Sequence, residues 1–165
     1  MQTIYLAGGC FWGTQKFFDQ FEGVIETETG YANGQGDRPS YEDVCRGSGH
    51  AETVRVVYDE HRITLEKLLR FYFMTIDPVS VNRQGNDIGV QYRTGIYYEG
   101  KRPSAIDTVM KEEAAKAEKP LAVETGPLVN FYPAEGYHQK YLDTHPFGYC
   151  HIPQELLTLA QKEKA

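Results

Sequence analysis

Hydrophobic and polar positions follow helical or strand periods along most of the chain, and these periods predict the secondary structure. In residues 63–77, apolar side chains recur at i, i+3, i+4, i+7, i+8 and i+11, which is the spacing of one buried helix face. In residues 24–31, Thr27 and Thr29 lie on one face and Glu26 and Glu28 on the other, which is typical of a strand. By the same criteria, strands are predicted over 3–7, 24–31, 51–59, 90–98 and 121–125, and helices over 11–21, 63–77, 103–119 and 134–143.

Two polar stretches interrupt this pattern, at residues 32–49 and 79–89, and both are predicted to be loops. The first is long for a compact domain, which favours a functional role. Helices interleaved with strands indicate one sheet with helices packed on it. We therefore expect a single α+β domain over residues 1–165, a two-layer α/β plait (ferredoxin-like) with a mixed sheet. Its C-terminal segment, residues 144–165, is expected to be irregular.

Composition narrows the class of protein. With 165 residues, 41% apolar and 24% charged, the chain is long enough for one real core. No run of about 18 apolar residues predicts a membrane span, and the N-terminus lacks the features of a secretion signal. The net charge is −6 without a basic patch, which argues against nucleic-acid binding. We expect a cytoplasmic protein, monomeric, with neither membrane nor nucleic acid as partner.

The three cysteines are Cys10, Cys45 and Cys150. Their odd number and wide spacing argue against a disulfide framework and favour working thiols in a reducing compartment. The alternative is that all three are buried as small apolar residues. Zinc is disfavoured, because Cys45 with His50 and Cys150 with His151 do not match the usual ligand spacings. No metal site is expected.

Cys10 follows a predicted strand and a Gly8-Gly9 turn and begins a predicted helix. Unpaired N–H groups and the helix dipole at such a position favour a thiolate, and glycines permit a sharp bend. This pattern indicates a nucleophile, although a cysteine buried beneath the helix start is the alternative. Lys16 stands where a phosphatase loop needs arginine, and a dinucleotide fingerprint is absent.

Two kinds of side chain could assist this thiol. Phe11 and Trp12 could line an apolar pocket for a thioether or methyl group, or they could anchor the helix to the core. Glu52 shares a strand face with apolar residues, and desolvation there would raise the carboxyl pKa and make it a proton donor. A frayed strand end that lets Glu52 reach water is the alternative.

Four further residues carry weaker indications. Tyr41 lies in the long loop, while Asp87 and Tyr92 flank the boundary between the second loop and a strand; taken alone, each fits a structural role better than a catalytic one. Cys150 lies in irregular sequence, HPFGYCH, from which it could reach Cys10 and form a disulfide. It could equally be a buried anchor for the C-terminal segment.

Several sequence blocks resemble one known family. They are GGCFWG (8–13), TGYANG (29–34), SYEDVCRGSGHAETVRVVYD (40–59), DPVSVNRQGNDIGVQYRTGIYY (77–98), FYPAEGYHQKYL (131–142) and HPFGYC (145–150). In this order they closely resemble peptide methionine sulfoxide reductase A over nearly the whole chain. The resemblance implies the same two-layer α+β plait, reduction of methionine-S-sulfoxide, recycling by thioredoxin and no cofactor.

The resemblance also implies a role for each matching residue. Cys10 would be the nucleophile, Glu52 the acid that protonates the sulfoxide oxygen, and Cys150 the resolving cysteine. Phe11 and Trp12 would enclose the S-methyl group, and Tyr41, Asp87 and Tyr92 would complete a polar wall around the oxygen. Cys10 would become a sulfenic acid, then a disulfide with Cys150, which thioredoxin or dithiothreitol reduces.

The chain departs from the family pattern at Gln15, where an acidic residue is frequent, and we expect little effect. No cysteine follows Cys150, so the Cys10–Cys150 bridge itself would meet the reductant. Two other classes share some of these features. A thiol peroxidase would need no methyl pocket, and a binding module for methionine-rich or oxidised peptides would show no turnover.

Overall fold

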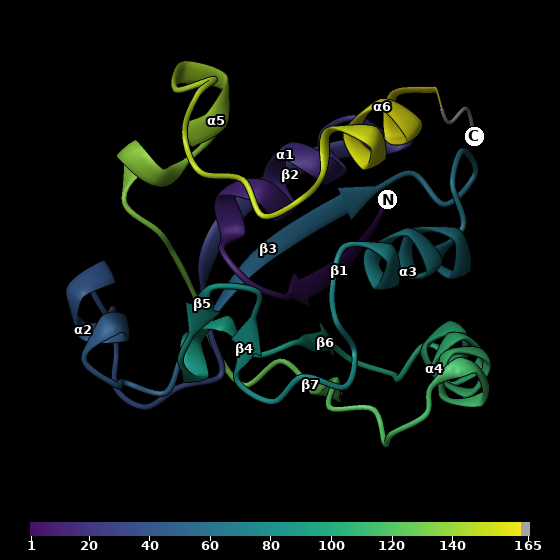
Figure 1. Cartoon of the computed structure of the whole chain (residues 1–165), viewed down its shortest axis with the longest axis horizontal. Coiled ribbons are helices and arrows are strands. Elements are labelled where there is room, and N and C mark those ends of the chain that lie inside the picture. The colour runs from purple at the N-terminus through teal and green to yellow at the C-terminus, as the bar shows by residue number, and fades with distance from the viewer. Residues whose placement is uncertain (163–165) are drawn as a thin grey trace.

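The computed structural model describes residues 1–162, and residues 163–165 of the predicted C-terminal segment lie outside the described part. Its centre is a mixed six-stranded sheet with the order β7-β6-β1-β3-β2-β8 (Figure 1). The strands are β1 (Gln2–Ala7), β2 (Val24–Ala32), β3 (Ala51–Tyr58), β6 (Gly95–Tyr98), β7 (Glu124–Pro127) and β8 (Phe131–Pro133). Neighbouring strands are antiparallel except β6 and β7, which are parallel.

Helices and short turns connect these strands. The helices are α1 (Phe11–Phe18), α2 (Tyr41–Cys45), α3 (Leu65–Met74), α4 (Ser104–Lys116), α5 (Tyr141–Thr144) and α6 (Gln154–Lys162). Two 3₁₀ turns, η1 (Val90–Tyr92) and η2 (Gly136–His138), and a small hairpin of β4 (Arg83–Gln84) and β5 (Asp87–Ile88) complete the described part. The chain is thus mixed α/β, as expected.

The core follows from alternation along the central strands. On β1, Ile4 and Leu6 belong to the main core with the apolar faces of α1 and α3, whereas Tyr5 and Ala7 pack on the other face of the sheet. Phe18 of α1 is fully buried in the main core. Every second side chain of the inner strands therefore points toward the helices and belongs to the main core.

Two elements differ from their predicted bounds, and local backbone geometry explains both differences. The predicted strand 90–98 begins only at Gly95, because η1 occupies its first residues. Gly89 has φ +146°, and its carbonyl accepts a 3.0 Å hydrogen bond from the Tyr92 N–H, which closes a turn. The predicted helix 134–143 is divided into η2 and α5 at Lys140, which has a left-handed φ of 54°.

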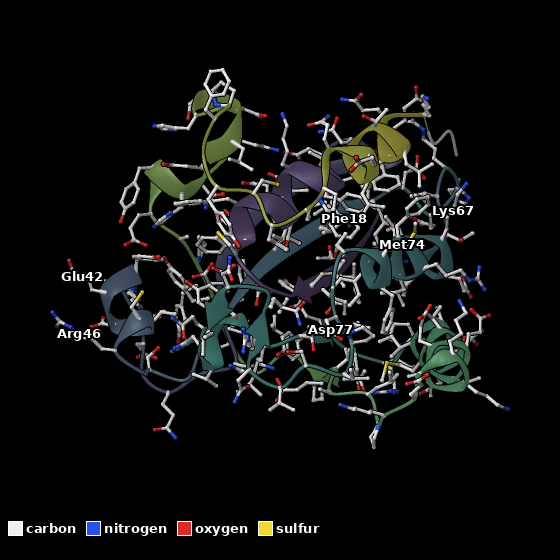
Figure 2. The ribbon with its side chains drawn as sticks, viewed as in Figure 1. Phe18, Glu42, Arg46, Lys67, Met74 and Asp77 are labelled. Atoms are coloured by element: carbon white, nitrogen blue, oxygen red, sulfur yellow. The ribbon has the colours of Figure 1, made fainter. Side chains whose placement is uncertain are left out.

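The polar and C-terminal segments contain more structure than predicted. The loop 32–49 contains α2, whose first turn is fixed by a capping box between Ser40 and Asp43. Glu42 and Arg46 of this segment point away from the sheet into solvent (Figure 2). The loop 79–89 contains the β4–β5 hairpin, and β8 was not predicted.

The prediction that the C-terminal segment is irregular is also wrong in part. The last residue of α5 lies in this segment, and α6 packs against α1. The amphipathic α6 buries Leu157 and Ala160. Burial of that apolar stripe is sufficient reason for the segment to form a helix. Among residues 1–162, no helix is both long and apolar enough to cross a membrane.

Candidate active site

Cys10 lies where the central strand β1 turns into α1. Gly9 has a φ of +76°, a conformation that glycine adopts without strain, and its N–H donates a 3.2 Å hydrogen bond to the Tyr92 carbonyl. Cys10 is the N-cap residue of α1, and its backbone is extended. The side chain is only 8% exposed, so the predicted strand–turn–cysteine–helix arrangement is present with the thiol inside the protein.

The electrostatics of Cys10 differ from our expectation. Burial raises the pKa of the Cys10 thiol, and the negative charge of Glu52 raises it further. The Trp12 backbone N–H at the helix start lowers this pKa but is outweighed. The expected net preference for a thiolate is therefore wrong for the unliganded protein, because the predicted helix-start effect is smaller than the cost of burying the charge.

Glu52 lies near the start of β3, on the face that it shares with Val54 and Val56. It is 1% exposed, so the alternative of a frayed strand end is excluded. Its Oε1 accepts a 3.1 Å hydrogen bond from the Phe11 N–H, while Oε2 is buried without a partner among the described residues. The two carboxyl oxygens therefore differ: one is held by the backbone and the other is free.

Burial raises the pKa of Glu52 from 4.5 to about 8, although the bond from Phe11 lowers it and Asp87 raises it. The carboxyl is thus protonated at neutral pH, which is the state that an acid catalyst needs. Protonation also removes the negative charge that raises the pKa of Cys10. The two groups are coupled, because discharge of one favours ionisation of the other.

Three other predicted residues lie in electrostatic range of this pair. Burial raises the pKa of Tyr41 and of Tyr92, and in both the charge of Glu52 is the second cause. Asp87 also acts on Glu52 and Tyr92, and its Oδ2 accepts a 3.1 Å hydrogen bond from the Tyr149 hydroxyl. Tyr41 and Tyr92 stay neutral at physiological pH, so each keeps a hydroxyl proton to donate.

An aromatic wall lies beside the helix start. Phe11 is 1% exposed and packs 5.7 Å from Tyr31 between ring centroids, so it does anchor α1 in the core. Trp12 is half-buried and stacks on Tyr141 with ring centroids 3.8 Å apart and an angle of 11° between the planes. The two predicted pocket residues therefore differ in exposure: Phe11 is buried, and Trp12 is partly exposed.

His138 contacts several rings of this aromatic wall and was not predicted as a site residue from the sequence. Its Nδ1 accepts a 3.0 Å hydrogen bond from the Trp12 indole N–H, and its ring lies 5.4 Å from Phe11 and 4.8 Å from Tyr41. Glu135, also not predicted, accepts hydrogen bonds from the Tyr31 hydroxyl and the Tyr41 N–H. Both residues lie in the block FYPAEGYHQKYL, so the resemblance contained the signal although neither was assigned a role.

Cys150 is brought to the same helix. A Cβ atom added to Gly13 would lie only 3.3 Å from Cys150 Sγ. The sulfur therefore packs against the first turn of α1. All three cysteines are free; Cys10 is buried, Cys150 half-buried and Cys45 exposed. Cys150 also lines a cavity of about 370 Å³ together with Lys16, Leu142, Pro146, Gly148, Ile152, Gln154 and Leu157. Cys150 is partly buried against the main core, so it both helps to anchor the C-terminal segment and keeps some exposed surface.

Gln15 has a larger role than we expected. It is 1% exposed, its Oε1 accepts a 2.8 Å hydrogen bond from the Lys140 N–H, and its Nε2 donates to the carbonyl and hydroxyl oxygens of Thr27. The amide therefore joins α1 to β2 and to the segment that carries His138. Only a side chain that both donates and accepts can make this set of bonds.

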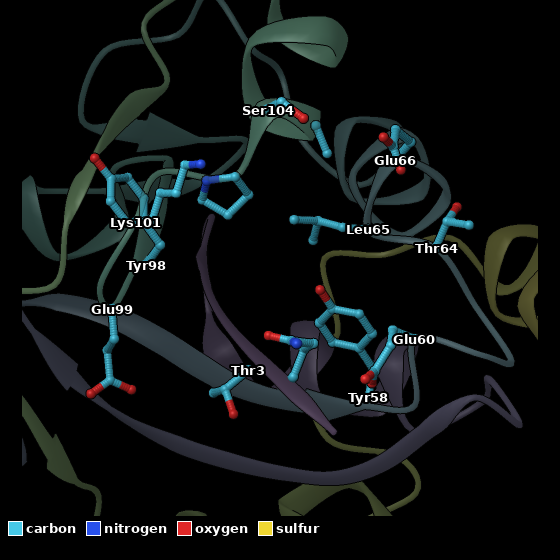
Figure 3. A pocket seen from close by; sticks show the side chains of 13 residues that line it. Thr3, Tyr58, Glu60, Thr64, Leu65, Glu66, Tyr98, Glu99, Lys101 and Ser104 are labelled. Carbon is cyan, nitrogen blue, oxygen red and sulfur yellow. The ribbon is translucent and has the colours of Figure 1, made fainter.

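A second cavity of about 420 Å³ lies at the other end of β1, between the first turns of α3 and α4 (Figure 3). Gln2, Thr3, Tyr58, Leu65, Tyr98 and Ser104 are among the residues that line it, and no cysteine does. Within residues 1–162, no group of three or more His, Cys, Asp or Glu side chains is placed to hold a metal ion.

Comparison with known proteins identifies one family. Residues 2–165 match the family model described as peptide methionine sulfoxide reductase. The chain is 54% identical to peptide methionine sulfoxide reductase MsrA of Lachnoclostridium phytofermentans, over 93% of each chain, and 51% identical to that of Clostridium acetobutylicum, over 95% of this chain and 98% of the relative. The solved structure of methionine sulfoxide reductase A of Corynebacterium diphtheriae is 35% identical and superimposes with a TM-score of 0.83, covering 93% of this chain and 83% of that one.

The family match and the fold therefore agree. The family model spans almost the complete chain, and two relatives exceed 50% identity over nearly their full lengths. These are oxidoreductases that reduce methionine sulfoxide. The chain belongs to the peptide methionine sulfoxide reductase family.

Proposed function

We propose that Cys10 attacks the sulfur of methionine-S-sulfoxide while Glu52 donates a proton to the sulfoxide oxygen. The observation that carries this proposal is the carboxyl of Glu52, which is buried and has one oxygen, Oε2, without a partner among the described residues, and whose burial raises its pKa. A sulfoxide oxygen needs such a donor, because the sulfur is a poor electrophile until the oxygen is protonated. A well-placed general acid raises the reaction rate roughly 10²–10⁴-fold.

The step balances without an added cofactor. The S–O bond of the substrate breaks, a new S–O bond forms at Cys10, and methionine leaves as the thioether. Glu52 gives its proton to the transferred oxygen and regains the thiol proton of Cys10, so the acid is restored. Cys10 is left as a sulfenic acid, whose sulfur has been oxidised as the substrate sulfur has been reduced.

The hydroxyls and rings around the pair fit the rest of the substrate. The neutral hydroxyls of Tyr41 and Tyr92 would donate to the sulfoxide oxygen, and Asp87 would complete the polar side. Trp12, with Phe11 behind it, would enclose the S-methyl group, because sulfur and methyl groups pack favourably on aromatic rings. A polar side facing an apolar side would select one sulfoxide epimer, which we take to be S.

Cys150 would then resolve the sulfenic acid as a Cys10–Cys150 disulfide. Its sulfur lies against Gly13, one turn from Cys10, and the two thiols are in electrostatic range. Thioredoxin or dithiothreitol would reduce the disulfide by exchange. We expect both free and protein-bound methionine sulfoxide to be substrates, so the protein would repair oxidised proteins.

We also propose a classification of the fold. The four inner strands β6, β1, β3 and β2 are mutually antiparallel neighbours, with α1 and α3 packed on one face. This arrangement fits a two-layer plait of ferredoxin-like order, extended at its edges by β7 and β8. In this proposal residues 1–165 are a single catalytic domain that acts as a monomer.

The test of the proposed chemistry is a single-turnover assay with separated sulfoxide epimers. Reduced protein is mixed with a methionine sulfoxide substrate and no external reductant, and methionine is measured by chromatography. Consumption of the S epimer alone, with loss of activity in Cys10→Ser, is expected. Methionine formation by Cys10→Ser would exclude Cys10 as the nucleophile.

A further inference from the structure

A buried imidazole that the proposed reaction does not use lies against the turn that carries Cys10. A Cβ atom added to Gly9 would lie 3.1 Å from Nε2 of His151, and one added to Gly13 would lie 2.9 Å from Nδ1 of the same ring. The ring of His151 therefore fills a slot that exists because both positions are glycine. Cys150 Sγ borders the same slot, 3.3 Å from the Cβ position on Gly13.

Both ring nitrogens of His151 are buried, and neither makes a hydrogen bond of good geometry among the described residues, although the Gly8 carbonyl lies close enough to raise the pKa of the ring. Buried polar groups are nearly always paired, because an unpaired one costs free energy. An apolar side chain would fill the slot without that cost. Ile152, 4% exposed, already anchors this segment in the core, so anchoring alone does not explain an imidazole here.

We propose that His151 serves the resolving step, in which its ring holds Cys150 against α1 and accepts the thiol proton of Cys150 as the disulfide to Cys10 forms. This inference rests on the proposed function. Sγ of Cys150 bonds to Sγ of Cys10 while the S–O bond of the Cys10 sulfenic acid breaks. The proton passes from the imidazole to the departing oxygen, which leaves as water. The oxygen comes from methionine sulfoxide, and no other oxidant is consumed.

The charged and titratable groups around the ring agree with this role. Burial lowers the pKa of His151, while Asp87 of β5 and the Gly8 carbonyl raise it. Burial raises the pKa of the Cys150 thiol, while its 3.5 Å hydrogen bond to the Ile152 carbonyl and the charge of Lys16 of α1 lower it. The imidazole is therefore a neutral base at neutral pH beside a thiol that does not ionise readily alone.

A proton acceptor gives the resolving step a distinctive pH dependence. With the neutral imidazole present, the rate of disulfide formation stays level above neutral pH, because every molecule carries its own base. Without it, only the Cys150 thiolate reacts, and its fraction rises about tenfold per pH unit below its pKa. A purely structural role for His151 would change the rate but leave the shape of the pH profile as it is.

The experiment compares His151→Gln with His61→Gln, an exposed histidine remote in sequence from the site. Each fully reduced protein is mixed with one equivalent of methionine sulfoxide and no reductant, from pH 6 to 9. Methionine is measured by chromatography, the Cys10 sulfenic acid by dimedone adduct mass, and the disulfide by alkylation of remaining thiols. In His151→Gln we expect one equivalent of methionine, an accumulated sulfenic acid, disulfide formation slowed about tenfold or more at pH 7, and a rate that climbs with pH.

A second variant, His151→Phe, fills the slot without a nitrogen and serves if the glutamine variant does not fold. It should resolve as slowly as His151→Gln. Resolution at the wild-type rate in either folded variant, or slowing by one constant factor at all pH values, would overturn the inference. If the wild-type protein itself produced no methionine, the proposed function would fail instead, so the two failures are distinguishable.

Discussion

The N–H of Phe11, the residue that follows Cys10, donates a 3.1 Å hydrogen bond to Oε1 of Glu52, 41 positions further along the chain. The bond links the first turn of α1 to the start of β3. It fixes one carboxyl oxygen, and Oε2 remains buried and unpaired. A shift of the helix start would therefore displace Cys10 and Glu52 together, because this backbone hydrogen bond ties their relative positions.

Replacement of Glu52 by glutamine should nearly abolish the first step. The amide keeps the shape of the side chain but cannot supply an acidic proton, so methionine formation should slow by roughly 10²–10⁴-fold. The wild-type rate should also fall as pH rises through about 8, where Glu52 loses its proton, and the residual rate of Glu52→Gln should lack that fall. Single-turnover rates of methionine formation between pH 6 and 9.5 measure both effects.

Glu26→Gln is a suitable control, because its carboxylate is exposed and pairs with Arg55 outside the site. It should retain the wild-type rate and pH profile. Full single-turnover activity in Glu52→Gln would remove Glu52 from the role of acid.

The same buried carboxyl should make stability depend on pH. Its pKa is 4.5 unperturbed and about 8 in the folded protein, so between these values the native state binds one more proton than the unfolded state. The free energy of unfolding should thus fall as pH rises from 4.5 to 8, by an amount on the order of a few kcal/mol. Urea unfolding of the wild-type protein and Glu52→Gln at pH 5 and 9 tests this, and the variant should gain stability relative to wild type at the higher pH. An equal difference at both pH values would contradict a raised pKa.

Cys150→Ser should uncouple reduction from recycling. Cys10 and Glu52 remain, so the variant should still convert about one equivalent of sulfoxide and then stall with thioredoxin as reductant. Steady-state turnover and the burst of methionine are measured with the same substrate. Cys45→Ser is the matched control and should turn over normally, because the exposed Cys45 has no step in the proposed relay. Sustained thioredoxin-dependent turnover in Cys150→Ser would assign the resolving role to another thiol.

Gln15→Glu should destabilise the protein, although the family resemblance led us to expect an acidic residue at this position. A carboxylate can accept from the Lys140 N–H but cannot donate to the Thr27 carbonyl, which leaves buried groups unpaired at a cost of about 1–3 kcal/mol. The loss should shrink at low pH, where the protonated carboxyl can donate. Urea unfolding at pH 4.5 and 7.5 measures the difference, with the exposed Gln161→Glu as control. An unchanged stability at pH 7.5 would show that the hydrogen bonds of Gln15 contribute little.

Local sequence was sufficient where the cause of a structure is local. The apolar run before Gly8, the turn at Gly9 and the helix after Cys10 were predicted together, and all are present. Alternation along 51–59 also placed Glu52 on the buried face, since register on a paired strand determines which side chains face the core. The same reasoning failed at Tyr92, because the backbone of Gly89 closes a 3₁₀ turn that alternation does not reveal.

Other features depend on contacts between distant parts of the chain. The hydrogen bond from Trp12 to His138 joins residues 126 positions apart, and the slot for His151 is formed by glycines more than 130 positions earlier. No periodicity encodes such pairs. The net effect on the Cys10 pKa was missed for a related reason, because the helix start is visible in sequence, whereas the extent of burial is set by the tertiary structure.

The resting state of Cys10 has a consequence for survival of the protein under the conditions that create its substrate. Peroxides oxidise thiolates far faster than thiols. Because burial raises the pKa of the Cys10 thiol, bulk oxidants would meet it mainly in its less reactive protonated form. In the proposed reaction the thiol proton leaves Cys10 only as Glu52 passes its own proton to a bound sulfoxide, so without substrate the sulfur would be shielded from peroxides.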